Sequence, residues 1–386
     1  PRTIEAFFRR GEYYFENKQY SLARVELQKA ISRSDQFART GRDPNLFFAS
    51  EAYFMLGEIE YVDYKNITLS YPESNLRAQL QQKQNKLRAV IDAFTTVIKM
   101  GSLKGFEAMY KVAEAYEEMA NAIAEQQLPP NLTPERKLVE RDRVFKASVP
   151  AYDRAVEEYK NVIENIPVYA QKLDVDIFDT TRMNIDKPMS LEDSSEVIQK
   201  IAFQDSTRDI ARKWYNTAQT KVSAILYSVA ERSAEFIDAY LRQQNPAKGL
   251  VYLSWKKLLL ERAVAPAVNV TLSSHLKNIK ISKELHLQNK FVQESERKIL
   301  LTSNVLAEEY GHLFQEAVKI YQADLPILYQ LIDGGERATT PTGMNSLDFN
   351  DQLMSVIDYM NEFITTALMQ YKNTLQFAQD NQINND

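Results

Sequence analysis

The opening stretch of the chain places apolar residues at helical spacing in two arcs, with a polar break between them. Phe7 and Tyr14 belong to the first arc, Leu27 and Ile31 belong to the second, and residues 17–18 separate the arcs. Apolar side chains three, four or seven residues apart line one face of an α-helix. The stretch therefore predicts two helices joined by a tight turn, a unit of about 30 residues whose length calls for a search for repeats.

Two later stretches repeat the pattern of this first unit. The second unit begins with Tyr53, Leu56 and Gly57, and the third begins with Ala113 and Tyr116. A second apolar helix with an aromatic residue follows each time. The repeat positions are Phe7, Gly11, Tyr14, Ala23, Leu27 and Ala30 in the first unit, Tyr53, Leu56, Gly57 and Phe94 in the second, and Ala113, Tyr116, Ala155, Tyr159 and Pro167 in the third.

These positions resemble the tetratricopeptide-repeat (TPR) family, whose units of about 34 residues carry an aromatic residue, a leucine–glycine pair and a tyrosine on the first helix. Arg10 stands where the family usually has leucine, and the later units carry insertions at residues 62–88 and 121–150 that we expect to be helical. The resemblance implies stacked helical hairpins. It places Gly11 where the two helices approach most closely, which would offset the helix-breaking tendency of glycine, and it places Pro167 at a helix end.

Glycine is scarce, and this scarcity favours an all-α fold. The chain has 10 glycines in 386 residues, where average usage gives about 27. Leu313, Ile320 and Ile327 recur every seven residues without the second stripe that a coiled coil needs, which indicates a helical bundle. We predict a TPR-like solenoid of helical hairpins over residues 1–168, a linker over residues 169–190, and a bundle of long helices over residues 191–386.

The sequence offers little for catalysis. The absence of cysteine excludes thiolate chemistry and cysteine-ligated metals. Among the three histidines, only His312 follows a glutamate, Glu309, at the spacing of di-iron bundles, and such sites need a second motif that neither His275 nor His286 supplies. We predict no catalytic residue, no metal and no cofactor. The alternative is a helical metal-dependent enzyme with a site near Glu309 and His312.

Composition and tyrosine placement point to protein partners. The net charge of −5 provides no basic excess for nucleic acid. Tyr13, Tyr20, Tyr61 and Tyr64 fall outside the repeat positions, and tyrosine is favoured at protein interfaces. We take these four tyrosines as candidate partner-binding residues. The resemblance to TPR proteins implies a non-catalytic interaction scaffold that holds a segment of another protein on its concave face.

The composition also favours an oxidising compartment. A protein without cysteine suits the bacterial periplasm. Because Pro1 stands where an initiator methionine would be, we expect an upstream segment such as a signal peptide or lipid anchor, which could associate the protein with a membrane. The resemblance extends to TPR lipoproteins of the bacterial cell envelope and outer membrane, and implies a subunit of a larger assembly. A cytoplasmic TPR regulator that senses a peptide is the other alternative.

Overall fold

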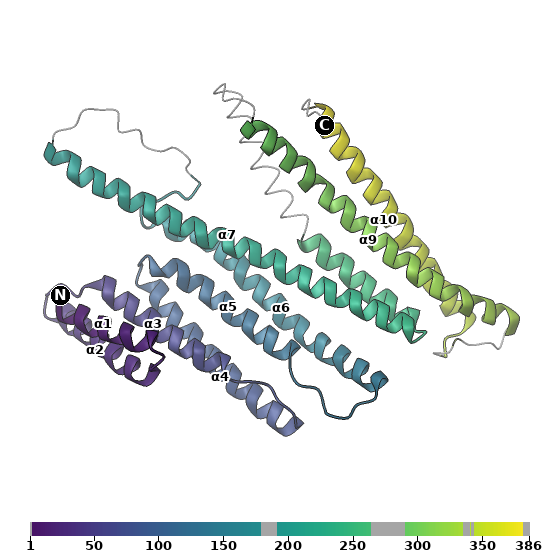
Figure 1. Ribbon diagram of the computed structural model, residues 1–386, viewed down its shortest axis with the longest axis horizontal. Helices are drawn as coiled ribbons and strands as arrows, with labels where there is room; N and C mark the ends of the chain where they lie inside the picture. The colour runs from purple at the N-terminus through teal and green to yellow at the C-terminus, as the bar shows by residue number, and fades with distance from the viewer. Residues whose placement is uncertain (1, 179–190, 264–289, 335–339, 341–342, 381–386) are drawn as a thin grey trace. The chain divides into compact units, whose positions relative to one another are not determined.

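The computed structural model describes the backbone of residues 2–178, 191–263, 290–334, 340 and 343–380. Every regular element in this part of the chain is an α-helix, and no strand occurs in it (Figure 1). The predicted all-α class is therefore confirmed. The residues form two compact units, Pro1–Val222 and Ser223–Asp386. The boundary falls inside a helix, whereas the sequence predicts divisions at residues 168 and 190, and residues 179–190 of the predicted linker lie outside the described residues.

The first unit contains three helical hairpins. Helix α1 (Arg2–Glu16) pairs with α2 (Tyr20–Arg39), α3 (Leu46–Lys65) pairs with α4 (Glu73–Lys99), and α5 (Lys104–Ala124) pairs with α6 (Pro134–Gln171). Helix α2 also packs on α3, and α4 packs on α5, while α1 contacts α3 and α3 contacts α5. Consecutive hairpins are thus stacked as in a helical-repeat solenoid, and their first helices form one row (Figure 1).

Apolar clusters shared between hairpins hold the stack together. One cluster joins α1, α2 and α3 around Ile4, Leu27 and Ile59, and a second joins α3, α4 and α5 around Phe94 and Ala108. All five side chains are fully buried. Because α3 contributes to both clusters, each hairpin completes the core of its neighbour, as expected of repeat units that cannot bury their apolar faces alone.

Small residues mark the closest contacts within the hairpins. A Cβ atom built on Gly11 would lie 2.7 Å from the side chain of Leu27, and one built on Gly57 would lie 2.8 Å from the ring of Phe94. Real Cβ atoms do not approach so closely, so each helix pair packs at a distance that only glycine permits. Gly105 makes a third contact of this kind, because a Cβ there would overlap the hydroxyl of Tyr169.

The predicted insertions lengthen the hairpins, as the sequence indicates. Residues 62–88 extend α3 and α4, and residues 121–150 extend α5 and α6. Thr133 caps α6 by accepting a hydrogen bond from the backbone N–H of Arg136, at 3.4 Å. The expected helix end at Pro167 is wrong, because α6 continues to Gln171. A proline removes one backbone donor, and the neighbouring Ile166 and Ala170 are fully buried, so packing keeps the last turn helical.

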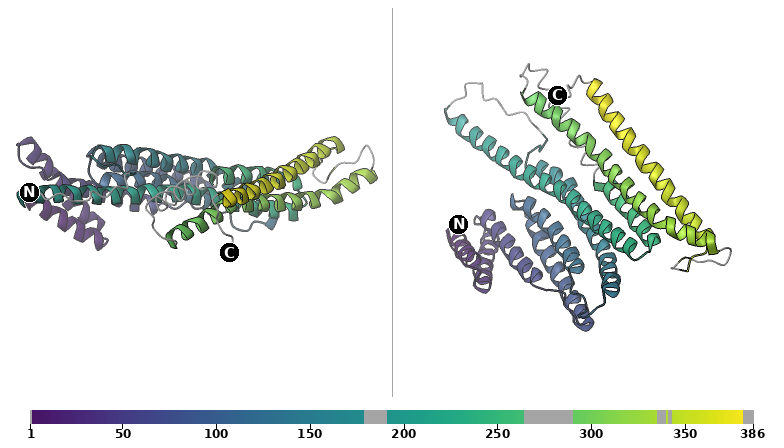
Figure 2. Two further views of the ribbon diagram at one scale, coloured as in Figure 1. Left: turned by 90° about the horizontal axis from the view of Figure 1, so that it is seen from above. Right: turned by 45° about the vertical axis from the view of Figure 1, so that its right-hand side comes forward.

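The second unit is a bundle of long helices. It contains the end of α7 (Leu191–Arg242), a helix over residues 246–263, α9 (Lys290–Gly334) and α10 (Ser346–Asp380), with α9 and α10 side by side (Figure 2). Leu313, Ile320 and Ile327 of the predicted seven-residue pattern are buried. None of the helices in the described part of the chain is both long and apolar enough to cross a membrane.

Candidate protein-binding surfaces

Two of the four candidate tyrosines are buried, which corrects the prediction that they bind a partner. Tyr61 and Tyr64 are 7% and 0% exposed. The hydroxyl of Tyr64 donates a 2.8 Å hydrogen bond to the backbone carbonyl of Ala115 on α5. The physical reason is the lengthened second hairpin. Helix α3 continues beyond the repeat motif, so both rings enter the cluster that it shares with α4 and α5.

A buried lysine secures the end of α3 beside these rings. The side chain of Lys83 on α4 is 1% exposed, and its Nζ donates to the carbonyls of Tyr64 and Ile67 at 3.2 and 3.1 Å and to Glu118 Oε1 at 3.3 Å. Burial lowers the pKa of Lys83, and the nearby Glu118 carboxylate opposes that change. The contacts supply a donor to the Tyr64 carbonyl in the last turn of α3, which also accepts from the backbone N–H of Ile67, and to the Ile67 carbonyl just beyond the helix.

The remaining two tyrosines differ in access. Tyr13 is 62% exposed, and its ring lies edge-on to Tyr14 at a centroid distance of 5.7 Å. Tyr20 is half-buried, and its ring lies edge-on to Phe15 at 5.7 Å. Tyr13 is therefore accessible to a partner, whereas much of Tyr20 is used to pack the first hairpin. Their use in binding stays a prediction.

The row of first helices carries two matching ion-pair stations. In each station, a lysine of α5 lies between a glutamate of α3 and a glutamate of its own helix. The stations are Glu51–Lys104–Glu107, with N–O distances of 3.7 and 2.9 Å, and Glu58–Lys111–Glu114, with distances of 3.3 and 2.9 Å. They lie two helical turns apart, and each lysine also faces an aromatic ring of α3.

Both stations are partly withdrawn from water. Burial raises the pKa of Glu51 and of Glu58, and the neighbouring lysines only partly offset this rise. Each station carries two acids and one base, so this face is acidic. Its lysines are already paired within the protein, and we interpret the stations as ties between α3 and α5.

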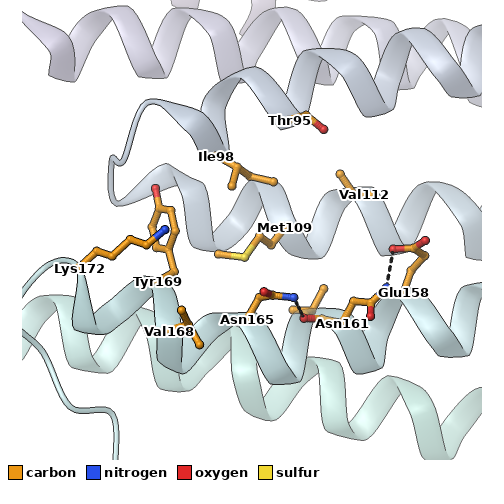
Figure 3. Close-up of a pocket in the computed structure, with 11 residues that line it drawn as sticks. Thr95, Ile98, Met109, Val112, Glu158, Asn161, Asn165, Val168, Tyr169 and Lys172 are labelled. Atoms are coloured by element: carbon orange, nitrogen blue, oxygen red, sulfur yellow. Dashed lines mark hydrogen bonds between the residues drawn. The ribbon is translucent and has the colours of Figure 1, made fainter.

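A groove opens between α4, α5 and α6 (Figure 3). It encloses about 290 Å³. Ile98 of α4, Met109 and Val112 of α5, and Val162 and Tyr169 of α6 provide its apolar lining. Helices of two successive hairpins thus build one concave site, which exists only when the hairpins are stacked.

Polar side chains of α6 border the groove. The amide of Asn161 donates to the carboxylate of Glu158 at 3.2 Å, and the amide of Asn165 donates to the carbonyl of Asn161 at 2.7 Å (Figure 3). Lys172 and Glu158 lie at opposite ends of the labelled residues (Figure 3). The groove therefore combines an apolar floor with amide groups and with opposite charges at its two ends.

Sequence reasoning did not find this groove. Its lining comes from three helices and includes Val168, which is 52% exposed although apolar. One hint was present in the sequence: Gly105 is a third glycine within a helix, and in the structure it contacts Tyr169 beside the groove. The sequence alone does not identify Tyr169 as the residue that Gly105 contacts, so the hint could not be used.

The Glu309–His312 pair lies near the surface of α9. His312 Nδ1 is 3.9 Å from Glu309 Oε2, and the His312 side chain is 61% exposed. Within the described residues, no group of three or more histidine or carboxylate side chains is placed to hold a metal ion. His275 and His286 lie outside the described residues. The pair thus has the geometry of neighbouring side chains on one helix face. Within the described residues, no further side chain joins Glu309 and His312 to form the metal site of the alternative hypothesis.

Comparisons with known proteins identify no family for this chain. No family model matches the chain, and no curated protein matches it. One solved structure, described as a circular tandem repeat protein with novel repeat topology and enhanced subunit contact surfaces, aligns over 97% of this chain and 84% of its own at 11% identity, with a TM-score of 0.20. A TM-score that low supports no argument. The helices themselves define the class, an all-α protein with repeat-like stacked hairpins.

Proposed function

We propose that the protein is a non-catalytic scaffold that binds a segment of another protein in the groove between α4, α5 and α6. The observation that carries this proposal is the groove itself, in which two successive hairpins supply an apolar floor and a polar border. Helical-repeat proteins bind partners on surfaces formed by neighbouring repeats. Such binding depends on side-chain pockets and shape and needs no catalytic group.

The size and chemistry of the groove favour a peptide segment. A volume of about 290 Å³ lies at the lower end of small-molecule sites and suits one or two apolar side chains. Amide side chains such as Asn161 and Asn165 can donate to and accept from a peptide backbone. Lys172 favours an acidic residue at one end, whereas Glu158 at the other end is already paired with Arg154 of its own helix. We expect the bound segment to carry an apolar anchor next to an acidic residue.

We also propose that the hairpins are TPR-type repeats and that the protein belongs to a larger assembly of the bacterial cell envelope. The close helix contacts at Gly11 and Gly57 support the first statement, and the cysteine-free composition supports the second. Membrane association would then come from an N-terminal anchor. Fractionation of native cells tests the location, and recovery of the protein in the cytoplasmic fraction would contradict it.

Two valines of α6 provide a matched test of the groove. Val168 and Val139 are each 52% exposed, and only Val168 lines the groove. We expect Val168→Glu to lose stoichiometric protein partners that both the wild type and Val139→Glu retain, because a carboxylate on the rim disfavours an apolar anchor. Quantitative mass spectrometry of material co-purified from the native source measures this. Equal partner recovery with both folded variants, or no stoichiometric partner of the wild type, contradicts the proposal.

A further inference from the structure

Helix α10 has two apolar faces, and only one of them is buried. The buried face packs against α9 and includes Phe349, Leu353, Val356, Phe363 and Ala367. The other face consists of residues that we name the α10 stripe: Leu347, Met354, Ile357, Asn361, Ile364, Leu368, Tyr371 and Leu375. Six of its apolar members are between 37% and 70% exposed, and Ile357 is half-buried. A contiguous exposed face of this kind indicates an interaction site.

The stripe follows a heptad pattern. Leu347, Met354, Leu368 and Leu375 share the seven-residue series with Asn361, and the remaining members lie three or four residues from that series. The first position of the second series, near the start of the helix, is the exposed Asn350. This is the alternation of a and d positions in a coiled coil. From its first to its last residue the stripe extends about 42 Å at the rise of an α-helix. A helix with the same period keeps contact along that whole length, whereas a helix of another period drifts away.

Asn361 at the centre of the stripe identifies the partner. Opposite an apolar side chain, its amide would lose water without gaining a hydrogen bond, at a cost of about 1–3 kcal/mol. Opposite the same asparagine of a second chain, the two amides can bond to each other. A single asparagine at an a position is the feature by which two identical helices fix their register.

The flanking charges agree with a parallel arrangement. Asp351 and Asp358 occupy e positions beside the stripe, and in a parallel pair an e position lies next to a g position of the other helix. The g positions include Leu353 and Ala367, which are apolar and buried. The acidic residues of two parallel copies therefore do not oppose each other, and no like-charge repulsion arises there.

We propose that the α10 stripe pairs with the α10 stripe of a second copy of this chain, in parallel and in register, as a two-stranded coiled coil. Each copy contributes a surface that is complementary to itself, as a two-fold dimer requires. The surface lies on α10 and the groove on α4, α5 and α6, so this inference is independent of the proposed scaffold function.

The oligomeric state tests the pairing. We expect the wild-type chain to be a dimer in sedimentation equilibrium and Leu368→Asp to be a monomer, because the substitution places a charge in the seam. Asn373→Asp adds the same charge to the opposite, exposed face of α10 and should stay dimeric. A wild type that is monomeric at every concentration, or a dimer that Leu368→Asp leaves intact, overturns the proposal.

A cysteine scan tests the orientation and does not depend on a disruptive substitution. Because the chain has no cysteine, Leu375→Cys introduces a single thiol at one end of the stripe. In a parallel pair the two thiols lie within disulfide distance, so we expect a disulfide-linked dimer under mild oxidation and none for Asn373→Cys. A dimer whose Leu375→Cys variant fails to cross-link overturns the parallel register and the role given to Asn361.

Discussion

A buried carboxyl group between α9 and α10 should make the second unit less stable as the pH rises. Asp324 on α9 is 0% exposed. Its Oδ1 accepts a 2.8 Å hydrogen bond from the side-chain amide of Gln352 on α10, and its Oδ2 is buried without a hydrogen-bond partner. Burial raises the pKa of Asp324 from 3.8 to about 7, and the bond from Gln352 only partly opposes the rise. The folded protein therefore prefers the neutral acid.

The size of the effect follows from the two pKa values. An exposed aspartate in the unfolded chain loses its proton near pH 4, whereas Asp324 in the folded protein keeps it to about pH 7. Between these values the folded state binds one proton more than the unfolded state. The free energy of unfolding then falls by about 1.4 kcal/mol for each pH unit, roughly 4 kcal/mol in all. Below this window and above it, the contribution of Asp324 is constant.

Asp324→Asn removes this dependence, because asparagine resembles the protonated acid at every pH. At about pH 5 the variant should be more stable than the wild type by about 1.5 kcal/mol, and at about pH 8 by roughly 4 kcal/mol. The two tryptophans make the second unit separately observable, since Trp214 lies in the first unit and Trp255 in the second. Urea unfolding followed by the fluorescence of Trp255, in a Trp214→Phe background, provides the measurement.

An exposed aspartate of the same helix serves as the control. Asp333 is exposed on α9, and Asp333→Asn should follow the wild-type profile across the range. The reasoning is refuted if the stability difference between wild type and Asp324→Asn is the same at about pH 5 and about pH 8. In that case Asp324 has the same protonation in both states, and its burial does not control the α9–α10 interface.

Three further substitutions test the first unit and its contacts, and a fourth, in the second unit, serves as a control. Gly57→Ala should destabilise the protein by about 1–3 kcal/mol, since the added Cβ would lie 2.8 Å from the buried Phe94 ring. Gly311→Ala is the control: its Cβ would have nothing within 4 Å, so it should stabilise its helix by up to about 1 kcal/mol. Thermal unfolding distinguishes the two variants. Lys83→Met should cost roughly 2–4 kcal/mol in urea unfolding, because the carbonyls of Tyr64 and Ile67 and the carboxylate of Glu118 lose the lysine as a donor. Tyr159→Phe should cost about 1–3 kcal/mol, because Tyr159 donates a 2.6 Å hydrogen bond to a carboxylate on α5. If a variant that we expect to be destabilised is as stable as the wild type, the contact given as the reason is wrong.

The helical hairpins could be predicted from the sequence because their evidence is local. Gly11 and Leu27 belong to adjacent predicted helices, and the expected close approach corresponds to the 2.7 Å contact that a Cβ on Gly11 would make. The long insertions could be read as helix because their apolar periodicity continues. The scarcity of glycine likewise favoured long helices over sheet architectures.

The surfaces could not be predicted in the same way, because they depend on contacts between distant parts of the chain. From the sequence, Tyr61 was a candidate for partner binding because nothing indicated which helices pack against the end of α3. In the structure α4 and α5 pack there and bury its ring. Ile98 and Val168 come together in the groove through the stacking of two hairpins. A periodic pattern indicates which face of a helix is apolar, and it does not indicate how many neighbours will cover that face.

Helix α5 shows why the groove and the repeat stack must be probed separately. Its Lys104 and Lys111 join the ion-pair stations with α3, while its Met109 and Val112 line the groove. Gly105 on the same helix sets the contact with α6. A substitution on α5 therefore alters the stack and the groove together, and a loss of binding would not identify its cause. A substitution on the exposed side of α6, such as one at Val168, separates the two effects, because it changes the groove and leaves the contacts between helices intact.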